Sequence, residues 1–144
     1  MSGFKVYDAK QVSLILASVP IQSGFNEGEF LTVEPVSPAF EDQVGTDGEV
    51  TRTRTNDNRA TVKVKLMQSS DGNALLSTLL NLDINTPGGA GVGTFLLRDR
   101  QGTTLCTGSK CWVVAPPSQS FDKTATVREW ELRVADMVYF VGGN

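Results

Sequence analysis

The chain has 144 residues, 40% hydrophobic and 20% charged, with a net charge of −3 at pH 7. This composition suits one domain of ordinary size with a buried core, and it excludes both a disordered chain and a protein that grips nucleic acid with its whole surface. Because the sequence contains no histidine, a Ser-His-Asp or Cys-His nucleophile system is impossible within this chain.

Most of the apolar pattern is of the strand type, because β-branched and aromatic residues alternate with polar ones over short runs. Strands are expected at Val12–Ala17, Val19–Gln22, Phe30–Val36, Thr61–Met67, Thr94–Arg98, Thr103–Cys106, Cys111–Ala115 and Thr126–Val134. Asp99–Gly102 has the composition of a hairpin turn between two of these strands.

One segment has helical spacing instead. A helix is predicted at about residues 71–81, with Ser70 or Asp71 as its cap. Its apolar stripe is formed by Leu75, Leu76, Leu79 and Leu80. Many short strands with one short helix predict a mainly β fold, a β-sandwich or barrel with the helix on one flank. We expect residues 1–144 to form this single domain.

Charged residues in the middle of the chain are segregated by sign. Seven acidic residues lie between positions 26 and 50 without a Lys or Arg, and five basic residues follow between positions 52 and 65. The basic part begins with VTRTRT, which alternates as a strand does but offers no apolar face. We expect an extended charged hairpin arm at about residues 40–58, with strands Phe40–Gly45 and Val50–Thr55 and a tip at Thr46-Asp47-Gly48.

Two interpretations of this hairpin arm stay open. It is either a solvated hairpin with cross-strand ion pairs or a complementary contact between copies of the chain, because an exposed polar strand edge can recruit a partner strand. The candidate contact residues are Glu41, Asp42, Asp47, Glu49, Arg52, Arg54, Asp57 and Arg59.

Candidate catalytic, cofactor and metal sites are weak. PGGAGVG lacks both the GK[ST] ending and the GxGxxG spacing of phosphate-binding loops, so we expect a flexible connector. Glu41 and Asp42 are a candidate carboxylate pair for acid–base chemistry or cation binding. They are adjacent in the sequence, however, and therefore face opposite sides of a strand. Cys106 and Cys111 cannot complete a four-ligand zinc site without histidine. We expect them to be small apolar residues flanking a TGSK turn; a hairpin disulfide is conceivable, but a reducing cytosol disfavours it. We expect that the protein is not an enzyme and that it binds no cofactor and no metal.

Large aromatic residues near the C-terminus are interpreted as core and end-sealing side chains: Trp112, Trp130, Tyr139 and Phe140. Arg128 and Arg133 flank Trp130, which leaves a second possibility open. A nucleic-acid-binding β-barrel of the OB type would stack bases on aromatic side chains of one basic face.

Four stretches carry a resemblance to a known family: VSLILASVPIQSGFNEGEFLTVE, FEDQVGTDGEVTRTRTNDNRATVKVKLMQSS, NALLSTLL and REWELRVADMVYFVGGN. In order and spacing they resemble the tail-tube proteins of contractile-tailed bacteriophages, which are similar to the haemolysin-coregulated protein of type VI secretion. The resemblance runs over almost the whole chain. It departs from the family mainly in Leu105–Val114, where the two cysteines lie.

The resemblance implies a structural subunit. Six copies join their sheets into a ring with a continuous inner β-barrel, and stacked rings form a hollow tube inside a contractile sheath. A tape-measure protein and later phage DNA occupy the lumen. The expected location is the virion tail, after synthesis in the host bacterial cytoplasm. No stretch approaches the ~18 apolar residues of a membrane-spanning helix, so no membrane insertion is expected.

An acidic balance suits a conduit for DNA, because an electronegative wall repels phosphate. In the family the first strands help to line the channel, and the candidate lumen-facing acids on such a wall strand are Glu27, Glu29 and Glu34.

Overall fold

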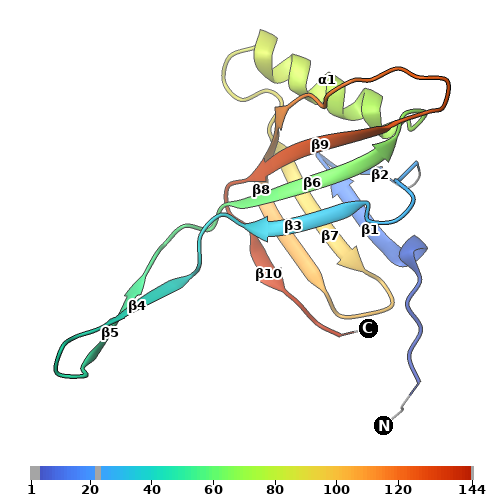
Figure 1. Cartoon of the computed structure of the whole chain (residues 1–144). Coiled ribbons are helices and arrows are strands. Elements are labelled where there is room, and N and C mark those ends of the chain that lie inside the picture. The colour runs from blue at the N-terminus through green and yellow to red at the C-terminus, as the bar shows by residue number, and fades with distance from the viewer. Residues whose placement is uncertain (1–3, 22–23, 144) are drawn as a thin grey trace.

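The computed structural model describes residues 4–21 and 24–143. Its elements, in chain order, are η1 (Ala9–Gln11), β1 (Val12–Leu16), β2 (Val19–Ile21), β3 (Leu31–Pro35), β4 (Phe40–Val44), β5 (Val50–Arg54), β6 (Ala60–Met67), α1 (Gly72–Asn85), β7 (Gly93–Asp99), β8 (Leu105–Ala115), β9 (Val127–Val134) and β10 (Val138–Phe140) (Figure 1). The predicted mainly β fold with one helix and a separate charged hairpin is confirmed.

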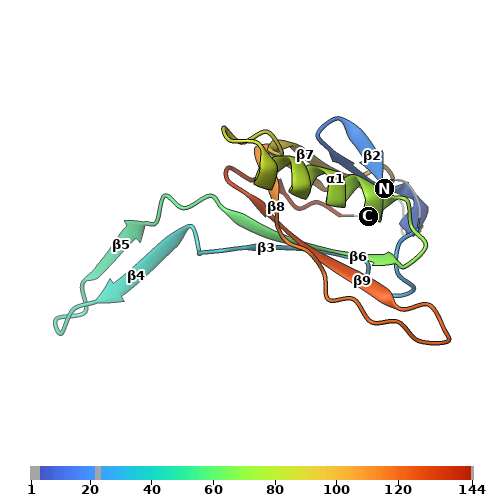
Figure 2. The ribbon, with the colours of Figure 1, turned by 90° about the horizontal axis from the view of Figure 1, so that it is seen from above.

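Among the described residues, eight strands form one antiparallel sheet in the order β2-β1-β7-β8-β9-β6-β3, with β10 paired to the first part of β8. The sheet folds over on itself, so that β3, β6 and β9 form one layer and β1, β2 and β7 form the other (Figures 1 and 2). β8 connects the layers because it pairs with β7 on one edge and with β9 on the other. The result is sandwich-like, with β3 at an open edge.

The core lies between the two layers, where the strand alternation directs its apolar residues. In β6, Ala60, Val62, Val64 and Leu66 are buried while the residues between them lie nearer the surface. The largest side chains with less than 2% exposure are Phe95, Leu14, Leu66, Leu76, Leu132, Val62, Val64 and Val134. Burying one such Val, Leu or Phe contributes roughly 1.5–3 kcal/mol, so this two-layer core stabilises the domain.

α1 covers one end of the sandwich and ends four residues later than predicted, at Asn85 (Figure 1). The predicted leucine stripe is confirmed, because Leu76 is fully buried and the three other leucines pack against the core. Asp71 occupies the cap position without a side-chain cap bond, whereas the Ser70 hydroxyl accepts a hydrogen bond from Gly72 N–H. Pro87 explains the end of the helix, since the residue before a proline avoids helical geometry.

The expected TGSK turn is wrong. The predicted strands Thr103–Cys106 and Cys111–Ala115 are parts of one strand, β8, which contains a bulge instead of a turn. The Asp136 carboxylate accepts hydrogen bonds from the N–H groups of Ser109 and Lys110 and from the Ser109 hydroxyl. These bonds lower the pKa of Asp136, the Ser109 hydroxyl contributing most. A Cβ at Gly108 would lie 2.3 Å from Val134 Cγ1, which explains the glycine there.

Other expectations need smaller corrections. The first strand ends at Leu16 because Ala17 and Ser18 adopt positive φ angles in the turn to β2. The predicted Gln22 lies outside the described residues. The chain turns at Asp99–Gly102 as expected, with Gly102 N–H donating to the Asp99 carbonyl.

The aromatic residues near the C-terminus divide into two groups. Trp130 is 3% exposed and lies in the core, and Trp112 is partly buried. Tyr139 and Phe140 lie on β10, a strand that the sequence pattern missed. They are 37% and 60% exposed, so the expectation that they seal the end of the core is wrong.

Candidate assembly surface

The hairpin of β4 and β5 projects away from the two layers (Figures 1 and 2). Every residue in both strands is exposed. Within the described part of the chain, the strands pair only with each other, in a two-stranded sheet. At the tip, Gly45 N–H donates to the Glu49 carbonyl at 2.8 Å and Glu49 N–H donates to Asp47 Oδ1 at 3.1 Å. An isolated two-stranded hairpin is marginally stable at best in water, so this arm is a candidate for contact with another molecule.

The hairpin has two different faces. Register places Phe40 opposite Arg54, Asp42 opposite Arg52 and Val44 opposite Val50, and we call these six residues the Phe40 face. Glu41, Gln43, Thr51 and Thr53 form the opposite, wholly polar face. β4 supplies two apolar residues to this face, Phe40 and Val44, which are 41% and 67% exposed; Val50, at the start of β5, adds a third and is 63% exposed. The hairpin therefore carries an exposed apolar and basic face.

The guanidinium groups of the Phe40 face lie against its aromatic ring. The Cζ atoms of Arg52 and Arg54 lie 4.2 Å and 5.5 Å from the centre of the Phe40 ring, in cation–π contact. The ion pairs among the described residues are Asp57–Arg59, Glu29–Lys65, Glu129–Lys65 and Glu131–Arg133. None of these pairs crosses from β4 to β5, so the hairpin does not use the cross-strand ion pairs of the solvated interpretation.

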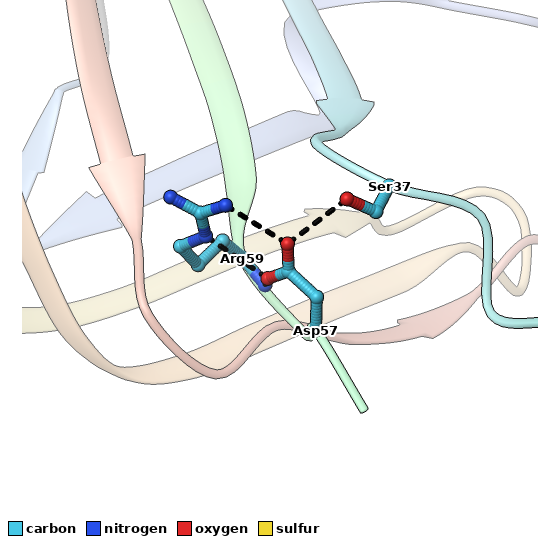
Figure 3. A network of polar contacts seen from close by, with 3 residues as sticks. All are labelled: Ser37, Asp57 and Arg59. Carbon is cyan, nitrogen blue, oxygen red and sulfur yellow. Dashed lines mark hydrogen bonds and ion pairs between the residues drawn. The ribbon is translucent and has the colours of Figure 1, made fainter. Parts of the chain in front are cut away.

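Asp57 and Arg59, two of the expected contact residues, pair with each other at the base of the hairpin (Figure 3). The Arg59 guanidinium donates to both Asp57 oxygens at 2.9 Å, and the Ser37 hydroxyl donates to Oδ2 at 2.9 Å. These hydrogen bonds, chiefly that from the Arg59 side chain, hold the pKa of Asp57 well below its usual range. Since Ser37 precedes β4 and Asp57 follows β5, the network joins the two connections that set the direction of the hairpin. We call it the base clamp.

The outer face of the layer formed by β3, β6 and β9 is polar. Cross-strand neighbours on it include Lys63 opposite Glu131 and Lys65 opposite Glu129. Its described charged residues, together with Glu29 at its border, are Glu29, Glu34, Glu129, Glu131, Lys63, Lys65 and Arg133. Four carboxylates and three cations make this face nearly neutral, so a strongly acidic wall is not found on it.

The three acids expected on a wall strand lie in different places. Glu34 lies on the outer face of β3, opposite Thr61 of β6. Glu27 and Glu29 precede β3, so their expected place on the strand is wrong. Glu29 instead pairs with Lys65 at 3.5 Å, which fixes part of its charge in a local contact.

An open groove of about 700 Å³ runs below the edge of β3. Its apolar lining comes from several separated segments and includes Tyr7, Val12, Phe30, Leu31, Leu97 and Val141. The charged residues in its lining, all of them described, are Glu29 and Asp99. Sequence patterns could not reveal this groove, because the segments that line it meet only in the folded sheet.

The alternative nucleic-acid platform does not form around Trp130. Its ring is buried, and its Nε1 donates to Asn73 Oδ1 at 2.9 Å. Arg128 is 7% exposed, donates to the Ser120 carbonyl at 3.4 Å and lies over the Phe121 ring, so it holds the loop before β9. Bases could not stack on a tryptophan in this position.

The described residues contain no group of His, Cys, Asp or Glu arranged to hold a metal ion. Cys106 and Cys111 are both free and buried. They lie five positions apart on one strand, about 17 Å by ordinary strand geometry, which is far beyond the reach of a disulfide. Within the described part of the chain, no helix has the length and apolar character needed to cross a membrane.

Comparison with known proteins gives independent evidence of the role. The chain is 26% identical over 122 residues to structural protein ORF10 of Pseudomonas phage KPP10, an alignment that covers 85% of this chain and 70% of that protein. This relative is a phage structural protein, which agrees with our expectation that the chain is not an enzyme.

Two solved structures share the fold. The tube-terminating cap of the anti-feeding prophage matches with a TM-score of 0.58 and 6% identity, covering 97% of this chain and 94% of that chain. The sheath/tube terminator of an extracellular contractile injection system, PVC, in its extended state, also matches with a TM-score of 0.58, at 13% identity over 97% and 100% of the two chains. At such low identities these matches establish the fold alone.

The family match is the most direct finding. The model of the bacteriophage PhiTE tail tube protein matches residues 17–142, which include α1, the hairpin and every strand except β1. A protein of this kind is a structural component of the phage tail, and so of the virion, rather than an enzyme. The chain belongs to the bacteriophage PhiTE tail tube protein family.

Proposed function

We propose that six copies of this protein close into a ring and that stacked rings form the hollow tube of a contractile phage tail. The tube lies inside the sheath, holds the tape-measure protein during assembly and conducts phage DNA during ejection. The subunit is made in the host bacterial cytoplasm before it enters the virion. The observation that carries this proposal is the β4–β5 hairpin, which projects from the sandwich with every strand residue exposed.

A further feature supports self-assembly. β3 ends the sheet order and leaves one backbone edge without a strand partner among the described residues, and such edges promote pairing between chains. Pairing this edge with a strand of a neighbouring copy removes it on assembly, which explains why an isolated subunit retains it. We assign Glu41, Asp42, Asp47, Glu49, Arg52 and Arg54 to the contact between rings, and Asp57 and Arg59 to the base clamp that aims the hairpin.

We assign the outer face of β3, β6 and β9 to the lumen. This face is densely charged but nearly neutral, and two of its three cations are paired with glutamates: Lys65 lies 3.5 Å from Glu29 and 3.7 Å from Glu129, and Arg133 lies 3.8 Å from Glu131. Paired cations offer little free positive charge to a passing phosphate backbone, whose binding depends on releasing counterions to Lys and Arg. Such a wall lets DNA slide without holding it, and Glu34 adds unbalanced negative charge.

Electron microscopy of the purified protein tests the proposal. We expect rings with six-fold symmetry in end views and long hollow tubes in side views. Tubes distinguish a tube subunit from a terminator, which would give single rings. A protein that remains monomeric across concentrations and salt conditions would contradict the proposal. Antibodies against this chain should also label the bare tube of contracted tails, where the sheath no longer covers it.

A further inference from the structure

The hairpin and the groove below β3 have complementary chemistry. The Phe40 face presents Phe40, Val44 and Val50 as apolar residues, and its two cations, Arg52 and Arg54, outnumber its one carboxylate, Asp42. The groove is lined mainly by apolar side chains, and its charged residues are the carboxylates Glu29 and Asp99. One surface is apolar and basic and the other is apolar and acidic, so each supplies what the other lacks.

Their backbone edges also match in length. β3, β4 and β5 each contain five residues, about 17 Å of extended chain. β3 borders the groove through Leu31, Val33 and Pro35, and its outer backbone edge has no strand partner among the described residues. In residues 4–21 and 24–143, β4 and β5 pair only with each other, so each also has an edge without a strand partner there. A hairpin strand can therefore add to β3 while its side chains enter the groove.

From these features we infer that the groove of each subunit receives the β4–β5 hairpin of a second copy of this chain. The inference rests on the proposed self-assembly and names the acceptor site for the hairpin. The apolar side chains of the Phe40 face enter the groove, and its arginines meet Glu29 and Asp99.

The hairpin of the same chain does not fill this role. It leaves β3 through a short connection and points away from both layers (Figures 1 and 2). The base clamp holds that direction, because Asp57 bonds both Ser37 and Arg59. The occupant is therefore the hairpin of another subunit, and the same pairing repeated along an assembly generates stacking.

Cysteine cross-linking between two full-length variants tests the inference. Val44→Cys places a thiol on the exposed hairpin, and Tyr7→Cys places one at the groove, where Tyr7 is 63% exposed. The two purified variants are mixed, allowed to assemble and oxidised, and the cross-linked peptides are identified by mass spectrometry. We expect a Val44→Cys to Tyr7→Cys cross-link between subunits. Val141→Cys, also at the groove and 79% exposed, gives the same test should Tyr7→Cys fail to fold.

Ile84→Cys is the matched control, because Ile84 is 69% exposed on α1 and does not line the groove. If tubes form and Val44→Cys cross-links to Ile84→Cys as readily as to a cysteine at the groove, the inference is overturned. The proposed function is left intact by this result. Tubes that form without any cross-link at the groove also overturn the inference and leave the proposed function intact. If the wild-type protein forms neither rings nor tubes, the proposed function fails first and this inference fails with it.

A charge exchange gives a second readout. Arg52→Glu with Arg54→Glu should raise the protein concentration needed for tube growth by about tenfold or more. Adding Glu29→Arg to the same chain should lower that concentration again, because opposite charges are restored across the contact. Glu131→Arg, on the outer face of β9, is the control substitution and should give no rescue. If Glu29→Arg and Glu131→Arg restored tube growth equally, the contact made by Arg52 and Arg54 would lie outside the groove.

Discussion

The Arg59 guanidinium donates two hydrogen bonds of 2.9 Å to the Asp57 carboxylate, one to each oxygen. The Arg59 backbone N–H adds a third, at 3.1 Å to Oδ1. Bidentate pairs of this kind restrict geometry as well as adding energy. Two residues expected to meet a neighbouring subunit are therefore paired with each other within one chain, at the base of the hairpin.

Asp57→Asn should loosen the base of the hairpin and impair tube growth while leaving the sandwich folded. The neutral amide cannot accept both guanidinium bonds, so the Arg59 backbone amide should exchange its hydrogen faster. Hydrogen exchange measured by NMR on the unassembled protein checks this. Asp47→Asn, at the hairpin tip, is the control and should leave exchange at Arg59 unchanged. Unchanged exchange in Asp57→Asn would show that the clamp does not hold the base.

The pH dependence of the base clamp follows from the sign of the shift. The pKa of Asp57 is lowered by the Arg59 hydrogen bonds, so the folded state favours the ionised carboxylate. Its stabilisation is fully present above the ordinary carboxyl pKa of 3.8 and is lost as the pH falls through the lowered value. Between pH 7 and pH 5 the protection of the Arg59 amide should remain constant after correction for intrinsic exchange. Loss of protection near pH 5 would contradict this ionisation state.

Charge reversal at Arg52 and Arg54 should block tube growth and leave the monomer folded. Exposed substitutions usually change stability by within about 0.5 kcal/mol, whereas a repeated contact multiplies even a weak effect. Sedimentation and electron microscopy report assembly, and circular dichroism reports folding. Arg100→Glu with Lys123→Glu reverses two other exposed cations and is the matched control. Normal tubes from the Arg52 and Arg54 variant would remove the Phe40 face from the ring contact.

Leu76→Ala should destabilise the domain by about 2–5 kcal/mol, because it removes a fully buried side chain that joins α1 to the core. Leu82→Ala, on the same helix but 43% exposed, should change stability far less. Urea denaturation gives both values, best measured in an assembly-deficient background because oligomers stabilise their subunits. Equal effects at the two positions would show that α1 is not anchored through Leu76.

Stability should fall as the pH rises above about 9. Burial raises the pKa of the Cys111 thiol from its ordinary value of 9.0 to about 12, and burial also raises the pKa of Cys106. The stabilising contribution is complete below the unfolded pKa and declines as the pH rises toward the folded value, by up to about 1.4 kcal/mol per pH unit for one proton. Urea unfolding between pH 8 and pH 11 measures this decline. Cys111→Ala should decline less steeply; identical slopes would contradict the assignment to Cys111.

Local patterns predicted most of the strands, the leucine-bearing face of α1 and the hairpin with its tip. They succeed where one face of an element is buried, as in Val62 and Val64, because burial imposes the periodicity that sequence displays. The hairpin is the converse case: VTRTRT has strand spacing without a face for its own core, and β5 indeed lies outside the core. Composition also limited the kinds of catalysis open to this chain, since a chain without histidine lacks the commonest catalytic base.

The bulge in β8 is where local patterns failed. Glycine and serine in TGSK favour a turn when only neighbours are considered. The groups that hold this segment in a strand, the Asp136 carboxylate and the Val134 side chain, come from more than twenty positions further along the chain. No local signal connects them.

By itself the sequence determined most of the secondary structure, the segregation of charge and the projecting arm, because each depends on spacing between near neighbours. Only the tertiary structure decided which charges act together. It paired Asp57 with Arg59, stacked Arg52 on Phe40 and placed Lys65 between Glu29 and Glu129. It also brought separated segments together around the groove beside β3. The physical reason is that charge contacts and grooves depend on distances in space, which the folding of the sheet sets.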